Sequence, residues 1–274
     1  GQSRAAPVAG AERHGQALHV VSNQDLLVSQ LLTPQTVSLP FGIAFVLVQF
    51  LDEGSWSFIA VASTLTAMAG IMFQPIRRVV DDWSFRLTRD EAGLRIQRGL
   101  VESRTQVVPL NRVQAVTATW PLLWRIAGWL RLRMDIAGYA EPAQAANAQP
   151  YLLPVGDQAA ARRVVAEALP GVDLAALALT PPPKRARWLR PLSQPLLGAG
   201  LSDHAFVARH GLLTQRLTIV PYARIQSVRV VQGPLQRRLR LATVCADVAG
   251  TAGATARHRD LNEAWALAAE LTVR

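Results

Sequence analysis

The sequence contains almost no cysteine and almost no lysine. Cys245 is the single cysteine among 274 residues, which excludes an internal disulfide framework and a cysteine-rich zinc site. Lys184 is the single lysine among the 29 basic residues, so arginine carries nearly all of the positive charge. The five histidines are scattered, and no HExxH, P-loop or GxSxG motif occurs. From these absences we expect no catalytic residue, no metal and no cofactor.

Charge itself is missing from a long stretch near the N-terminus. Between Asp25 and Arg77 only two adjacent acidic residues carry charge, and they separate uncharged runs of 26 and 23 residues. A membrane-spanning helix needs about 20 mostly apolar residues, so we expect a transmembrane helical hairpin over residues 26–76. The alternative is a helical hairpin buried in a soluble protein, because neither run shows the charged face of a surface helix.

The rest of the composition is basic. The formal net charge is +10 and the isoelectric point is about 11.2. A basic chain favours polyanionic partners, which include anionic lipid, acidic proteins and nucleic acid. Nucleic acid is the least expected of these, because no basic strip with interleaved aromatic residues lies on the expected strands.

A segment of forty residues occurs twice, at an offset of 112 residues. Residues 99–138 align with residues 211–250 without a gap, and thirteen of the forty positions are identical. A duplicated segment of this length is a folding unit. The retained positions include Gly99 and Gly211, Pro109 and Pro221, Arg112 and Arg224, and Gln114 and Gln226. The simplest role for these residues is structural, and a polar recognition pair is the alternative for the Arg and Gln positions.

Each copy has the pattern of short strands followed by one helix. Leu130–Ile136 alternates apolar and charged residues, which is typical of a strand with one buried face. Glycine and proline interrupt the upstream strands at regular intervals, which indicates an antiparallel meander. A helix follows, for which Asp157 is the expected N-cap in the first copy.

The order of these features resembles a known family. A Gly-Leu turn, a strand ending in Pro and an Arg-x-Gln motif occur in both copies, as VVPLNRVQAV and IVPYARIQSV. This order resembles the bacterial pleckstrin-homology-like (PH-like) domain of the YdbS/YdbT-type membrane proteins. The resemblance implies a mostly β fold, with two PH-like partly open β-barrels that are each closed by a C-terminal α-helix and preceded by the transmembrane hairpin. Such proteins often carry another domain of this kind before the first hairpin, so the resemblance suggests an N-terminal truncation.

These expectations divide the chain into five parts. They are a disordered or truncated N-terminal segment (1–25), the transmembrane hairpin (26–76), a first PH-like domain (82–172), a Pro/Arg-rich linker (173–190) and a second PH-like domain (191–274).

Two groups of residues are candidate interaction surfaces. Basic residues beside an indole suit an anionic bilayer surface. The expected lipid or membrane-surface residues are Arg77, Arg78, Lys184, Arg185, Arg187, Trp188 and Arg190. The alternative is a solvated linker whose tryptophan packs on one domain. The expected interaction surface for a partner is formed by Trp120, Trp124 and Trp129, with core packing as the alternative.

The sequence therefore predicts a membrane-anchored tandem PH-like protein that acts as an interaction or scaffold module. Its partner would be an unknown protein or a second copy, and binding of anionic-lipid headgroups is the alternative. Because Arg77 and Arg78 directly follow the second uncharged run, we expect a multi-pass protein of the bacterial inner (plasma) membrane with both repeats facing the cytoplasm.

Overall fold

The computed structural model describes residues 16–33, 75–137, 151–249 and 251–273, together with isolated positions between residues 40 and 73. The described strands form three sheets. The first is antiparallel in the order β1-β2-β3-β4. Its strands are β1 (Gln16–Val20), β2 (Arg86–Asp90), β3 (Gly93–Arg98) and β4 (Arg104–Val108).

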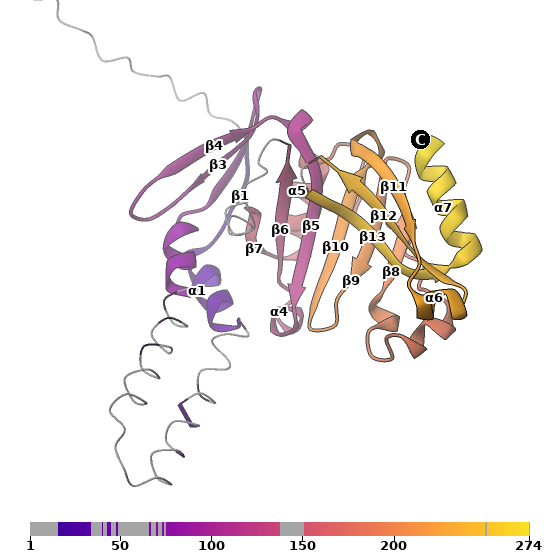
Figure 1. The fold of residues 1–274 in the computed structure, drawn as a ribbon. Coiled ribbons are helices and arrows are strands. Elements are labelled where there is room, and N and C mark those ends of the chain that lie inside the picture. The colour runs from indigo at the N-terminus through magenta and orange to yellow at the C-terminus, as the bar shows by residue number, and fades with distance from the viewer. Residues whose placement is uncertain are drawn as a thin grey trace, which may run out of the picture.

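The second sheet has six strands and contains parts of both repeats. Its order is β7-β6-β5-β10-β9-β8, and it occupies the centre of Figure 1. The first repeat contributes β5 (Val113–Pro121), β6 (Leu130–Ile136) and β7 (Tyr151–Gly156). The second repeat contributes β8 (Gly198–Leu201), β9 (Ala205–His210) and β10 (Thr214–Pro221). The two repeats are thus joined by the antiparallel pairing of β5 with β10.

The third sheet belongs to the second repeat alone, in the order β11-β12-β13. Its strands are β11 (Ile225–Val231), β12 (Leu241–Val248) and β13 (Thr251–Asp260). The α-helices are α1 (Asn23–Leu31), α4 (Leu122–Ile126), α5 (Gln158–Ala168), α6 (Pro234–Arg238) and α7 (Leu261–Val273). Short 3₁₀ helices are η1 (Leu110–Arg112), η3 (Lys184–Trp188), η4 (Gln194–Leu196) and η5 (Tyr222–Arg224).

Nine elements of the first repeat correspond to nine elements of the second. The pairs are β2 and β8, β3 and β9, β4 and β10, η1 and η5, β5 and β11, α4 and α6, β6 and β12, β7 and β13, and α5 and α7. An isolated bridge between Thr180 and Ala199 beside β8 takes the place that β1 has beside β2. In the first repeat, the segment that leads from β1 to β2 is residues 21–85. In the second repeat, the segment that leads from Thr180 to β8 is only residues 181–197.

The retained glycines are explained by the turn after β3 and its counterpart after β9. Gly99 and Gly211 have φ angles of +114° and +106°, in the region that side chains with a Cβ rarely adopt. A Cβ on Gly99 would lie 2.1 Å from the carbonyl oxygen of Glu102, and one on Gly211 would lie 1.9 Å from that of Thr214. Glycine is therefore required by the backbone path at both places.

Two hydrophobic cores lie on opposite faces of the six-stranded sheet. Along β9, Ala205 and Val207 join the core of the first repeat, whereas Phe206 and Ala208 join that of the second. Leu169 and Val172, which follow the end of α5, also belong to the first core. A strand that is buried on both faces cannot leave its neighbours without exposing both cores, so the junction is part of the fold.

The predicted fold class is wrong about the two barrels. The repeats do not form two separate barrels, because the described strands form three open sheets and the middle one is shared. Alternation along a strand shows which side chains face a core, but it does not show which strand pairs with its edge. The N-terminal segment also differs from expectation, since Gln16–Val20 forms β1 and pairs with β2; residues 1–15 lie outside the described residues.

The predicted transmembrane hairpin is also wrong. No helix within the described residues has the length and apolar character needed to cross a membrane. The start of the first uncharged run lies in α1, where Leu26 is buried in the core of the first repeat. Most of residues 34–74 lies outside the described residues. This finding contradicts the expected membrane anchor. It also contradicts the expected multi-pass inner-membrane location with cytoplasmic repeats.

Candidate anion-binding pocket in the second repeat

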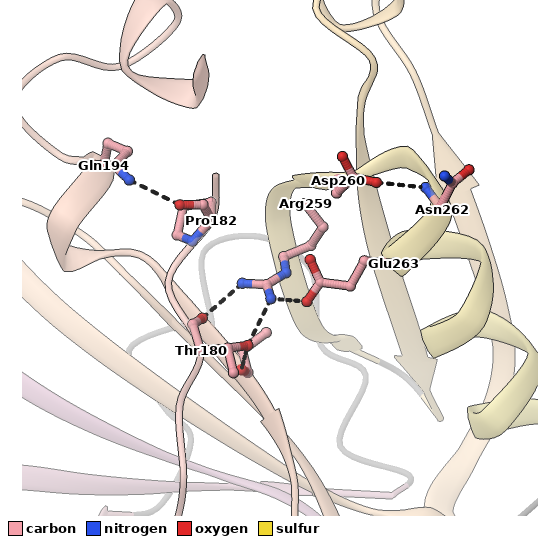
Figure 2. Close-up of polar contacts among 8 residues, drawn as sticks. Thr180, Pro182, Gln194, Arg259, Asp260, Asn262 and Glu263 are labelled. Carbon is pink, nitrogen blue, oxygen red and sulfur yellow. Dashed lines mark hydrogen bonds and ion pairs between the residues drawn. The ribbon is translucent and has the colours of Figure 1, made fainter. Parts of the chain in front are cut away.

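The loop of residues 181–197, which connects the repeats, is held against the second repeat with the help of a buried arginine. Arg259 on β13 is 2% exposed, and its Nη1 donates to the backbone oxygen of Thr180 at 2.7 Å. Its Nη2 donates to the Thr180 hydroxyl at 2.7 Å and pairs with Glu263 on α7 (Figure 2). A single guanidinium thus joins the residue that directly precedes this loop to the last strand and the last helix.

Further contacts hold the rest of this loop in place. The Gln194 side chain donates to the backbone oxygen of Pro182 at 2.9 Å, as Figure 2 shows. Arg185 forms an ion pair with Asp260 and donates to the backbone oxygen of Arg240 at 3.1 Å. The loop is therefore attached to the second repeat at several points along its length.

The C-terminal half of this loop encloses a pocket with the turn after β9 and one residue of β13. The cavity has a volume of about 510 Å³. Its lining residues are Leu189, Arg190, Pro191, Leu192, Ser193, Leu197, His210, Gly211, Leu212 and Arg257. The charged side chains among them are Arg190 and Arg257, and none of the ten is acidic. Neither arginine has an ion-pair partner within the described part of the chain.

His210 is a half-buried polar residue of this pocket. Burial lowers its pKa below the ordinary value of 6.5, and the charges of Arg257 and Arg216 lower it further. Arg216 is its cross-strand neighbour on β10. The His210 Nδ1 atom is buried and has no hydrogen-bond partner in the described structure. A buried polar atom without a partner is costly, so it marks a place where an incoming acceptor or donor would be stabilised.

A β-bulge directs Arg257 into the pocket. Between Ala256 and Arg259 the pairing of β13 with β12 gains one residue, and His258 has a φ angle of +55°. Bulges redirect side chains at functional sites, and positive φ at a residue other than glycine stores strain. The Nδ1 of His258 lies 2.9 Å from the Gln236 side-chain nitrogen, which holds the bulge in place. The amide nitrogen of Gln236 can only donate, so the His258 Nδ1 accepts this hydrogen bond. Burial lowers the pKa of His258, followed by the charges of Arg190 and Arg257, which favours the neutral ring that can accept.

Exposed apolar side chains lie on or beside the chain segments that line the pocket. Trp188 is 85% exposed at the end of η3, and Leu192 and Leu213 are also exposed. On the neighbouring α4, Ile126 is 84% exposed and Leu122 is exposed as well. Figure 1 shows α4 and the turn between β9 and β10 together at the lower edge of the six-stranded sheet. We call these five side chains the apolar rim.

At the corresponding place in the first repeat, a basic side chain is paired with an acidic one. Arg98 is the residue that aligns with His210, and it donates to Asp82 at 3.0 Å. Asp82 is buried; its pKa is raised by burial, and Arg98 opposes that shift. The repeats therefore differ in charge at equivalent places, since the second has Arg190, Arg257 and His210 without an acid.

The tryptophans of the first repeat are placed differently from the predicted interaction surface. Trp124 is fully buried, and its indole nitrogen donates to the backbone oxygen of Ser29 on α1 at 3.0 Å. Trp120 and Trp129 are partly buried against the core of the first repeat. The exposed apolar residues of this segment are instead Leu122 and Ile126.

The other predicted residues are dispersed. Arg77 forms an exposed ion pair with Asp81 at 3.8 Å, and Arg78 is half-buried in the same helical segment, so neither lines the pocket. Lys184 and Arg187 are exposed on η3. The retained Arg and Gln residues differ between copies. Arg112 and Gln226 are exposed, Arg224 is half-buried, and Gln114 is buried and donates to the backbone oxygen of Arg112 at 3.4 Å.

Sequence reasoning identified Arg190 but missed His210, Arg216 and Arg257. The local signal was the clustering of Arg and His in ARHG and ARHRD near the ends of two strands. That signal became informative only when the fold brought the two clusters together. Within the described ranges, no group of three His, Cys, Asp or Glu side chains is arranged to hold a metal ion.

Comparison with known protein families identifies both repeats as the same type of domain. A family model described as Bacterial PH domain matches residues 38–169 and again residues 164–273. Searches of the curated proteins and of the solved structures found no match. The two matches agree with the tandem arrangement of the repeats.

Proposed function

Because the chain belongs to the bacterial PH domain family, we propose that it is a non-catalytic interaction module whose second repeat binds a phosphate-bearing anionic group. The match to PH-like domains suggests a module that binds proteins or lipids. Within the family, we assign the chain to the YdbS/YdbT type on the strength of the VVPLNRVQAV and IVPYARIQSV segments.

The observation that carries the proposal is the uncompensated positive charge of the pocket. Arg190 and Arg257 border a cavity that contains no acidic side chain, and the unpartnered Nδ1 of His210 lies beside them. Arginine presents several N–H donors in a rigid plane that matches the oxygens of phosphate. Hydrogen bonds between charged partners are about twice as strong as neutral ones. An anion with several oxygens is therefore the ligand that satisfies this arrangement.

The apolar rim favours a lipid headgroup as the source of the phosphate. Trp188, Leu192 and Leu213 are exposed on the chain segments that line the basic pocket, and an apolar side chain at a bilayer surface can enter the acyl boundary. Lys184 and Arg187 on the same loop add charge, and each basic residue near an anionic surface contributes about 1 kcal/mol. The pocket would bind the phosphate while the rim contacts the lipid.

Vesicle co-sedimentation of the complete chain tests the proposal. We expect binding to vesicles that contain phosphatidylglycerol and little binding to pure phosphatidylcholine. The double variant Arg190→Gln/Arg257→Gln should lose at least tenfold in affinity. The matched control is Arg104→Gln/Arg162→Gln, which removes the same charge from the first repeat and should retain binding. Equal losses of affinity in the two double variants would show that binding depends only on the net charge of the chain, and would overturn the proposal.

A second arm separates a lipid headgroup from soluble phosphate. Calorimetry with inorganic pyrophosphate measures the pocket without a bilayer. Binding of vesicles that is stronger than binding of pyrophosphate supports the headgroup, whereas binding of pyrophosphate alone identifies a soluble ligand. Absence of both contradicts an anion site.

A further inference from the structure

We propose that copies of this chain assemble head to tail, by pairing β11 of one copy with β4 of another in the register that joins β5 to β10 within the chain. The occupant of each edge is thus a second copy of the same protein. The inference goes beyond the anion site and does not depend on it.

The internal junction defines the pairing. β10 of the second repeat pairs with β5 of the first from Thr214 opposite Pro121 to Ile219 opposite Val116. The Thr117 and Thr218 hydroxyls, which face each other across it, are 3.4 Å apart. Within one chain, therefore, the fourth strand of one repeat already binds the fifth strand of the other.

The same two strand types are left at the ends of the described sheets. By the offset of 112 residues, β4 corresponds to β10 and β11 corresponds to β5. β4 lies at the end of the first sheet next to β3, and β11 lies at the end of the third sheet next to β12. An edge strand presents a row of backbone donors and acceptors, which is a template for another strand.

The geometry of the free edge matches that of the occupied one. The pairing of β5 with β6 shifts register between Val113 and Ala115, and that of β11 with β12 shifts between Ile225 and Ser227. These positions are equivalent in the repeat, so β5 and β11 present the same bulged outline. Neither β4 nor β11 contains a proline, a residue that blocks many natural edges.

Side chains on the two edges are compatible in the inferred register. The pairs would be Arg104 with Val231, Thr105 with Val230, Gln106 with Arg229, and Val107 with Val228. No pair places like charges opposite each other. The two arginines already have partners in their own repeat, since Arg104 pairs with Glu102 and Arg229 with Asp247.

Apolar surface on both edges would become buried. Val107 is 45% exposed and Val231 is 47% exposed. Val228 and Val230 are only partly covered by the core of the second repeat. Each added copy would bring a new free β11 or β4, so the assembly is heterologous and forms either a closed ring or an open filament.

Engineered cysteines test the register directly. In a Cys245→Ser background, a Val107→Cys chain is mixed with a Val228→Cys chain under mild oxidation. Directly opposite residues have Cβ atoms about 4.5–5.5 Å apart, within reach of a disulfide after small adjustment. We expect a covalent dimer that contains one chain of each kind. The control mixture of Val107→Cys with Val231→Cys is three residues out of register, roughly 10 Å along the strand, and should give at least tenfold less.

Light scattering after size-exclusion chromatography tests assembly without crosslinks. The mass of the native chain should rise with concentration, and Val107→Lys should weaken that association at least tenfold by placing a charge on the edge. Val273→Lys is the matched control at an exposed position on α7, and circular dichroism checks the fold of each variant. Monomers at all concentrations, equal crosslinking in the two mixtures, or preferential Val107–Val107 crosslinks would overturn the proposal.

Discussion

The two repeats have the same order of elements, but they differ in how they neutralise charge beside the turn after their third strand. In the first repeat, Arg98 is paired with the buried Asp82. In the second, His210 lies beside Arg257 and Arg216, and the pocket contains no acid. A position that is fixed by a shared fold can thus be structural in one copy and available to a ligand in the other.

The segment that borders this place also differs between the repeats. In the second repeat it is the short loop of residues 181–197, which Arg259 and Gln194 fix in position. In the first it is residues 21–85, of which the described part contains α1 and the helical segment 75–81. The second repeat therefore has a rigid pocket wall close to its sheet, and the following predictions test what that wall does.

The largest effect should come from removing the Arg259 guanidinium. Arg259→Met deletes two hydrogen bonds to Thr180 and the pair with Glu263, so we expect a loss of about 2–4 kcal/mol in the free energy of unfolding. Urea denaturation measures it. Arg187→Met, an exposed arginine on the same loop, is the control and should change stability by less than about 0.5 kcal/mol. Equal unfolding midpoints for the two variants would show that the loop is not held by Arg259.

The apolar rim should matter for vesicles alone. Leu213→Ser with Ile126→Ser removes two exposed side chains that do not line the pocket, and partial immersion of each is worth about 1 kcal/mol. We expect binding to phosphatidylglycerol vesicles to fall about 30-fold while binding of pyrophosphate in calorimetry is unchanged. A loss in both assays would mean that the substitutions damage the pocket.

An acid placed in the pocket should make the second repeat resemble the first. Ser193 lines the cavity, so Ser193→Asp introduces a negative charge near Arg190 and Arg257. We expect about a tenfold loss of affinity for pyrophosphate, which corresponds to about 1.4 kcal/mol. Ser193→Asn has nearly the same shape without the charge and should bind like the native protein. Similar weakening by both would point to shape as the cause.

The smallest effect concerns pH. In the free protein the pKa of His210 is lowered, so folding favours the neutral ring and this contribution to stability is lost as the pH falls below about 6.5. A bound anion favours the protonated ring, so the affinity for the anion should rise severalfold as the pH falls through this window. The positive charges of Arg257 and Arg216 oppose protonation of the ring. Calorimetry with inorganic sulfate measures this change in affinity, because sulfate does not change its charge in that pH window. His210→Gln should remove the pH dependence, and an unchanged slope would exclude His210.

Much of the fold was predictable because the relevant signals are local. The alternation in Leu130–Ile136 predicted β6 with its bounds, and Asp157 caps α5 as expected by accepting from the backbone nitrogen of Ala160 at 2.7 Å. The repeat predicted equivalent elements in both halves, and the family match supports the tandem. These features depend on residues that are close in sequence.

The shared sheet and the pocket were not predictable, because they depend on contacts between distant segments. Nothing in β5 or β10 alone shows that their edges meet. His210 and Arg257 are 47 positions apart, and it is the fold that brings them to one cavity. The uncharged stretch was misinterpreted because its first residues supply the protein core through Leu26. Trp124 was misleading for a related reason, since a buried tryptophan and an exposed one look alike in sequence.

The most direct test of this contrast uses one histidine from each repeat. Burial lowers the pKa of His19 on β1 in the first repeat and that of His210 in the second. NMR titration of the imidazole protons, with His210→Gln and His19→Gln for assignment, gives both values with and without saturating inorganic pyrophosphate. The account predicts that pyrophosphate raises the pKa of His210 and leaves that of His19 unchanged. Equal shifts at both histidines, or none at His210, would contradict an anion site confined to the second repeat.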